Sequence, residues 1–119
     1  MTPFDLEERL IEFAVIIIKL SKKLSSCYAG RHLGKQIVRS GTSPGLHYGE
    51  AQSAESRKDF IHKLKWVLKE LRETNANLMM IKKAELSDST ELLEQAIQEN
   101  HELISIFVKS LKTAERNRR

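Results

Sequence analysis

Apolar side chains recur at helical spacing along most of the chain. In each of three long segments they alternate at intervals of three and four residues, the period that brings them to one side of an α-helix. No segment alternates apolar and polar residues with a period of two, so no sheet is predicted. The three seams are Leu6, Leu10, Phe13, Ile17, Leu20 and Leu24; then Phe60, Leu64, Val67, Leu71, Leu78 and Ile81; and last Leu93, Ile97, Ile104, Phe107 and Leu111.

Capping residues and helix breakers divide this pattern into four predicted helices, at about residues 3–26, 31–54, 57–85 and 89–115. Thr2 and Pro3 suit the start of the first helix. Gly30 suits a helix stop before the second, and Ser56 with Asp59 three residues later is a capping-box variant before the third. The sequence therefore predicts an all-α, up-down antiparallel four-helix bundle, in a single domain over residues 1–119.

The stretch from Ser40 to Gly49 interrupts the pattern with three glycines and a proline. Propensity alone favours a loop, because Gly41 and Gly45 weaken a helix and the ring of Pro44 clashes with the Ser40 carbonyl in a straight one. Small and apolar residues on both sides still continue one helical face. We therefore expect residues 31–54 to be mostly helical, with a break or kink between Ser40 and Pro44.

The first helix carries a second apolar stripe, formed by Ile11, Val15 and Ile18, beside its seam. One stripe is enough to join a small bundle, so two stripes indicate a helix that is buried nearly all round or that faces another subunit. We favour self-association through these three residues. A central helix inside a monomer is the alternative.

The net charge of +4 is distributed unevenly, because no Asp or Glu occurs from Phe13 to Gly49 while six cations do. Such a segment suits an acidic partner such as nucleic acid, and a solvated basic helix end is the alternative. Arg31, Lys35 and Arg39, at i, i+4 and i+8, predict a basic ridge along one helix face. The candidate nucleic-acid contacts are Lys22, Lys23, Arg31, Lys35, Arg39, Lys58 and Lys63.

Two other groups of side chains bear on this surface. Tyr28, Tyr48 and Trp66 are the candidates for stacking on a base, although we expect Trp66 to pack against the protein. The sequence has no motif that reads bases, so binding would be led by the RNA backbone and shape. We interpret the carboxylates of the second and third predicted helices as ion-pair partners of the cations. They are expected to form a structural polar network that fixes how the helices align. Its members are Arg39, Glu50, Glu70 and Glu73.

The sequence offers no motif for catalysis or for a metal. GTSPG lacks the spacing of a phosphate-binding loop, and the approach to a Glu-x-x-His pattern at Asp59 and His62 is a single copy where a di-iron site needs two. No catalytic residue, metal, cofactor or small-molecule substrate is predicted. The single Cys27 fits a reducing compartment. Acidic residues stand where a signal peptide is basic, and the run Phe13–Ile18 is too short to span a bilayer, so a cytoplasmic protein is predicted.

The run over residues 36–83 resembles a known family. In order it carries Arg39-Ser40, Ser43-Pro44-Gly45, Glu50-Ala51, Ser56, Asp59-Phe60 and Glu73. This order is similar to that of the bacterial four-helix bundle proteins known from 23S rRNA intervening sequences, which are related to the accessory protein of diversity-generating retroelements. The family often has Asn near Tyr48 and Ala or Ile near Gly45, and this chain departs from it there.

The resemblance implies that the second helix runs through the glycine-rich segment. It also implies a non-enzymatic protein that forms a ring-like homopentamer. Relatives are thought to bind structured RNA, or to partner a reverse transcriptase, through a basic surface. The alternative function is an oligomeric protein-interaction scaffold whose cations only keep it soluble, and a nucleic-acid affinity that falls steeply with salt would separate the two.

Overall fold

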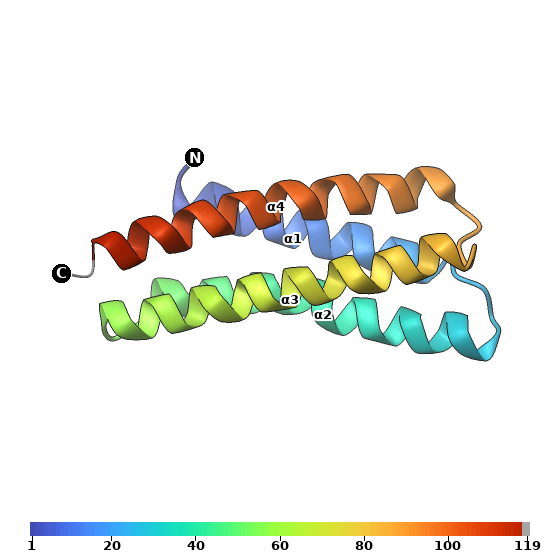
Figure 1. Ribbon diagram of the computed structural model, residues 1–119, viewed down its shortest axis with the longest axis horizontal. Coiled ribbons are helices and arrows are strands. Elements are labelled where there is room, and N and C mark those ends of the chain that lie inside the picture. The colour runs from blue at the N-terminus through green and yellow to red at the C-terminus, as the bar shows by residue number, and fades with distance from the viewer. Residues whose placement is uncertain (118–119) are drawn as a thin grey trace.

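The computed structural model describes residues 1–117 and holds four α-helices joined by short connections (Figure 1). They are α1 (Pro3–Ser21), α2 (Tyr28–Gln52), α3 (Arg57–Lys83) and α4 (Thr90–Arg116). Successive helices run in opposite directions (Figure 1), and α1 packs against both α2 and α4 while α3 packs against α2 and α4. The molecule is a rod with extents of 50 × 23 × 20 Å. The prediction of an all-α four-helix bundle is confirmed.

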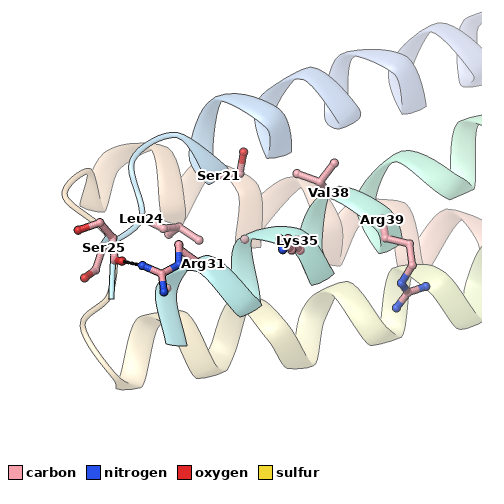
Figure 2. A pocket seen from close by; sticks show the side chains of 10 residues that line it. Ser21, Leu24, Ser25, Arg31, Lys35, Val38 and Arg39 are labelled. Carbon is pink, nitrogen blue, oxygen red and sulfur yellow. Dashed lines mark hydrogen bonds between the residues drawn. The ribbon is translucent and has the colours of Figure 1, made fainter. Parts of the chain in front are cut away.

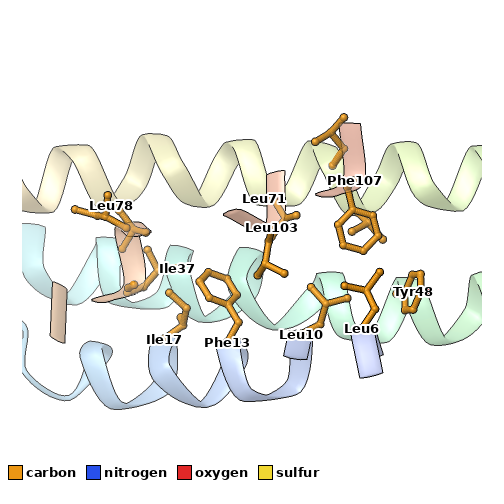
Figure 3. Packing of buried hydrophobic residues seen from close by; sticks show 14 of the residues in the cluster. Leu6, Leu10, Phe13, Ile17, Ile37, Tyr48, Leu71, Leu78, Leu103 and Phe107 are labelled. Carbon is orange, nitrogen blue, oxygen red and sulfur yellow. The ribbon is translucent and has the colours of Figure 1, made fainter. Parts of the chain in front are cut away.

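The core is built from the predicted apolar seams. In α1, Leu6, Leu10, Phe13, Ile17 and Leu20 are all buried, and they meet buried residues of the other three helices in one apolar interior (Figure 3). Tyr48 belongs to this interior too, because its ring packs edge-on against Phe107 with centroids 5.5 Å apart. Tyr48 is therefore not available for stacking on a base.

Local hydrogen bonds fix the ends of the helices. Thr2 forms a reciprocal capping box with Asp5 at the start of α1. At the end of α3, the N–H of Leu86 donates to the carbonyl of Ile81 at 3.0 Å, and Glu85 adopts the left-handed conformation with φ of 55°. This arrangement is a Schellman motif. It ends α3 at Lys83, two residues before the predicted end.

The connection between α1 and α2 is longer than predicted, because α1 ends at Ser21 rather than near residue 26. Its backbone pairs with the connection between α3 and α4: Ser25 N–H donates to the Leu86 carbonyl, and Asp88 N–H donates to the Lys23 carbonyl, both at 2.8 Å. These bonds replace the last helical turn that the apolar pattern predicts. Leu24 still packs against the core from this connection.

The predicted start of α2 near residue 31 is also wrong, because α2 begins at Tyr28. Cys27 caps the helix through its sulfur, which accepts the N–H of Gly30 at 3.4 Å. Gly30 lies inside the first turn instead of ending a helix. A Cβ atom at Gly30 would lie 2.0 Å from the Ser25 carbonyl oxygen, so this turn tolerates only glycine.

Residues 31–54 are mostly helical as predicted, but of the two alternatives between Ser40 and Pro44, a break or a kink, the break is wrong, because α2 is one continuous helix with Pro44 inside it. The glycines serve helix packing here. A Cβ atom at Gly41 would lie 2.8 Å from Cγ1 of Ile17, so glycine lets α1 approach α2 closely. Helix propensity is a property of single residues and does not take the contact between Gly41 and Ile17 into account. Propensity alone therefore favours a break in the helix.

Candidate nucleic-acid interface

An open groove lies between the C-terminal end of α1 and the N-terminal half of α2, and we call it the α1–α2 groove (Figure 2). Its volume is about 550 Å³. Buried Gly30 and Gly34 and half-buried Leu24 and Val38 contribute small and apolar surface. The full lining is Ser21, Leu24, Ser25, Ser26, Gly30, Arg31, Gly34, Lys35, Val38 and Arg39, which includes three cations and no carboxylate.

Gly34 helps to keep this groove open. Gly34 and Leu24 face each other, since a Cβ atom at Gly34 would lie 3.6 Å from Cδ1 of Leu24. A larger side chain at Gly34 would extend toward Leu24 and narrow the hollow between the two helices. The groove therefore depends in part on the absence of a side chain at Gly34.

Arg31 and Lys35 stand exposed beside the groove, one turn apart on α2. The guanidinium of Arg31 donates to the Ser26 carbonyl (Figure 2), which holds the arginine near the connection from α1. Among residues 1–117, neither Arg31 nor Lys35 has a carboxylate within ion-pair distance. Their positive charges are thus uncompensated and open to an anionic ligand.

Arg39 is engaged by carboxylates of α3. Its guanidinium pairs with Glu70 at 3.2 Å and with Glu73. The Glu70 side chain is only 5% exposed, and burying an unpaired carboxylate is costly, so Arg39 provides the charge that Glu70 needs. Beside this cluster, the hydroxyl groups of Thr74 and Ser40 are hydrogen-bonded at 2.7 Å within the core. Arg39 therefore joins α2 to α3, and it offers less positive charge to the groove than its two neighbours.

Glu50 lies outside the cluster of Arg39, Glu70 and Glu73. It stands 3.6 Å from His47 and 3.8 Å from Lys63. Eleven residues of α2 separate Arg39 from Glu50, a distance of roughly 16 Å along the helix. The structure thus brings together three of the four residues of the predicted polar network and places the fourth elsewhere.

The comparisons with known proteins agree with this architecture. A family model described as 23S rRNA-intervening sequence protein matches residues 4–109. The chain belongs to this family. The resemblance that residues 36–83 indicate is confirmed, and the match extends over nearly the whole bundle.

A solved structure gives the same result. A protein of unknown function from the S23 ribosomal protein family of Bacteroides thetaiotaomicron shares 35% sequence identity with this chain. The similarity covers 94% of this chain and 99% of that chain, with a TM-score of 0.83. A search of curated proteins finds no match. Sequence and structure comparisons thus agree on the family and on its four-helix fold.

The seven predicted nucleic-acid contacts do not form one patch. Lys22 and Lys23 are exposed at the end of α1, close in sequence to the groove lining. Lys58 and Lys63 belong to the first turns of α3, at the opposite end of the rod (Figure 1). Lys63 is also within 3.8 Å of Glu50. Lys22 and Lys23 thus lie at the same end of the rod as Arg31 and Lys35, whereas Lys58 and Lys63 lie at the other end.

The second apolar stripe of α1 faces away from the core. Ile11, Val15 and Ile18 are 45%, 43% and 38% exposed. They are separated by four and three residues, so they form a continuous row along two turns of helix. In a single chain this row is in contact with water, whereas the seam on the other side of α1 is buried.

A cluster around Trp66 is not predicted from the sequence. The indole N–H donates to His62 at 3.2 Å, His47 stacks on the ring with centroids 5.4 Å apart, and the Lys69 ammonium lies 4.9 Å from the ring centroid. The spacing of His62, Trp66 and Lys69 at i, i+4 and i+7 is a signal that could have revealed part of it. His47 comes from α2, and only the fold brings it there.

Two further properties concern the kinds of site that the described chain can hold. Within residues 1–117, no group of three or more His, Cys, Asp or Glu side chains is placed to bind a metal ion. None of the described helices combines the length and the apolar character that crossing a membrane requires.

Proposed function

We propose that this chain is a cytoplasmic, non-enzymatic protein that assembles into a homo-oligomer and binds structured RNA, alone or with a protein partner such as a reverse transcriptase. The observation that carries the proposal is the α1–α2 groove, where Arg31 and Lys35 stand exposed and unpaired in a lining without carboxylates. Uncompensated cations on one face are the electrostatic feature that attracts the phosphates of nucleic acid.

The charge distribution and the family support the same proposal. The acid-free segment from Phe13 to Gly49 forms the C-terminal half of α1 and most of α2, so no anionic side chain of these parts of the two helices opposes RNA. The family is named for sequences inserted in 23S rRNA. Because no base-reading motif accompanies the cations, contacts to phosphates and to RNA shape provide the affinity.

Assembly is the second part of the proposal, and the exposed row of Ile11, Val15 and Ile18 supports it. Covering an apolar row of this kind with a second copy removes it from water, which is the main driving force of association. In a ring-like oligomer, as the resemblance implies, the grooves of several copies would repeat around the assembly. Repetition raises the affinity for an extended RNA without any new contact.

Fluorescence anisotropy across a salt series, with a labelled structured RNA, tests RNA binding. The variant Arg31→Glu/Lys35→Glu removes the two unpaired cations and leaves Arg39 in place, so the buried Glu70 keeps its partner. Wild type is expected to show a steep negative slope of log affinity against log salt. The variant is expected to bind more weakly, with a slope smaller by about two, because each lost phosphate contact lowers it by about one.

The matched control is Lys109→Glu/Lys112→Glu, which makes the same charge change at exposed positions of α4. It is expected to retain most of the affinity. Light scattering confirms that all three proteins have the same assembly. An equal loss in the control would contradict a site at the groove. Absence of binding by the assembled wild type would overturn RNA binding and favour the protein-interaction scaffold.

A further inference from the structure

An aromatic pair stands next to the two unpaired cations of α2. Tyr28 and His32 stack with ring centroids 6.1 Å apart and ring planes only 7° apart. Tyr28 is 77% exposed and takes no part in the hydrophobic core. The Tyr28 ring is therefore exposed to water at the N-terminal end of α2, where Arg31 and Lys35 also lie.

The aromatic pair and the cations follow one helix face. Tyr28, His32, Lys35 and Arg39 are separated by four, three and four residues, the spacing that aligns side chains along an α-helix. Arg31 lies three residues from Tyr28, about 4.5 Å along the helix axis. A planar group on Tyr28 would thus have the guanidinium of Arg31 and the ammonium of Lys35 as its nearest positive neighbours on α2.

The other exposed aromatic group with basic neighbours is already engaged. Trp66 stacks with His47, lies beneath the Lys69 ammonium and donates its indole N–H to His62. It is also half as exposed as Tyr28, at 38% against 77%. Tyr28 is therefore the more accessible of these two rings.

We propose that Tyr28, supported by His32, is a stacking platform for an unpaired RNA base whose neighbouring phosphates contact Arg31 and Lys35. This inference rests on the proposed function and specifies its substrate class. Bases inside an A-form duplex are stacked on each other, whereas bases in loops, bulges and single strands expose a face that an aromatic side chain can cover. The ligand is thus RNA with unpaired nucleotides rather than continuous duplex.

Two fluorescein-labelled RNAs test the proposal: a stem–loop with an unpaired adenine loop, and a blunt duplex with the same number of nucleotides. Anisotropy is measured for wild type, Tyr28→Ala and Tyr28→Phe, with circular dichroism and light scattering to verify fold and assembly. Wild type is expected to prefer the stem–loop. Tyr28→Ala is expected to lose about tenfold or more of its stem–loop affinity, with duplex affinity and salt slope unchanged, because no phosphate contact is removed.

Tyr28→Phe keeps the ring and is expected to bind the stem–loop like wild type, which separates stacking from a hydrogen bond of the hydroxyl group. Full stem–loop affinity in Tyr28→Ala, with salt-dependent binding by wild type, would overturn the platform and leave RNA binding at the groove intact. An equal loss on both RNAs would overturn the assignment to unpaired bases. Absence of binding by wild type to either RNA would overturn both proposals.

Discussion

Gly41 occupies a position where Ile17 leaves no room for a side chain. A Cβ atom there would lie 2.8 Å and 2.9 Å from the two γ carbons of Ile17, and Ile17 is fully buried. A β-branched side chain in a packed core has few alternative rotamers, so it cannot move aside at low cost. The helix-breaking residue of the sequence is thus part of the packing between α1 and α2.

The first prediction is that Gly41→Ala lowers the free energy of unfolding by about 1–2 kcal/mol, because overpacking exceeds the gain in helix propensity. Gly49→Ala is the matched control, since its Cβ atom would lie 3.5 Å from Glu7, an ordinary contact. It is expected to be neutral, or to stabilise by about 0.5–1 kcal/mol. Urea denaturation measures both, and equal effects of the two substitutions would refute the packing role of Gly41.

The second prediction concerns the charge that Glu70 buries. Arg39→Ala removes its partner and is expected to cost about 1–3 kcal/mol of stability, because a buried carboxylate is left without its ion pair. In a Glu70→Gln background the same substitution is expected to cost much less. A double-mutant cycle in urea measures the difference. If Arg39→Ala costs the same in both backgrounds, the pair between Arg39 and Glu70 does not stabilise the fold.

At the scale of whole elements, α1 and α4 are held by charge as well as by the core. The guanidinium of Arg9 binds Glu99 at 2.7 and 2.8 Å and Glu102 at 2.9 Å. The Gln98 amide, and after it the Arg9 guanidinium, hold the pKa of Glu102 below its ordinary value. A carboxylate whose pKa is lower in the folded state adds stability above its ordinary pKa and loses it as the pH falls through the folded pKa.

The third prediction concerns the pH dependence of the stability that Glu102 provides. Wild type is expected to be more stable than Glu102→Gln at pH 7, and the difference is expected to vanish once the pH falls below the lowered pKa of Glu102. Glu12→Gln, at an exposed position without an ion pair among the described residues, is the control and should show no such trend. Urea denaturation from pH 7 to about pH 3 measures it. A difference that persists unchanged at the acid end would contradict a lowered pKa of Glu102 in the folded state.

At the level of the whole molecule, the exposed apolar row of Ile11, Val15 and Ile18 on α1 is the surface through which we propose self-association. The fourth prediction is that the wild type assembles, while Val15→Lys/Ile18→Lys has the mass of a single chain, 13.7 kDa, with unchanged helical content. Lysine in a covered apolar interface is strongly unfavourable, whereas it is well solvated in a monomer.

Met80→Lys is the control for this experiment, because Met80 is an apolar side chain of α3 with 55% exposure. It is expected to leave the assembly unchanged. Light scattering gives the mass, and circular dichroism gives the helical content. A monomeric wild type, or an intact assembly of the α1 variant, would contradict self-association through Ile11, Val15 and Ile18.

The sequence is sufficient to predict the number of helices, their approximate limits and the buried side of α1, because a period of 3.6 residues shows which side chains share one face of a helix. It also indicated the family through residues 36–83, and it located the positive charge between Phe13 and Gly49. All of these are properties of neighbouring residues along the chain, and local spacing is sufficient to reveal them.

Which helix faces meet depends on contacts between helices, and these exist only in the folded bundle. The spacing of Arg31, Lys35 and Arg39 is uniform, yet only Arg39 meets carboxylates, because only its turn of α2 lies against Glu70 and Glu73. Gly41 is a helix breaker by propensity and a packing surface in the fold, because its neighbour Ile17 comes from another helix. Periodicity describes each helix separately, whereas grooves and ion pairs depend on the contacts between helices.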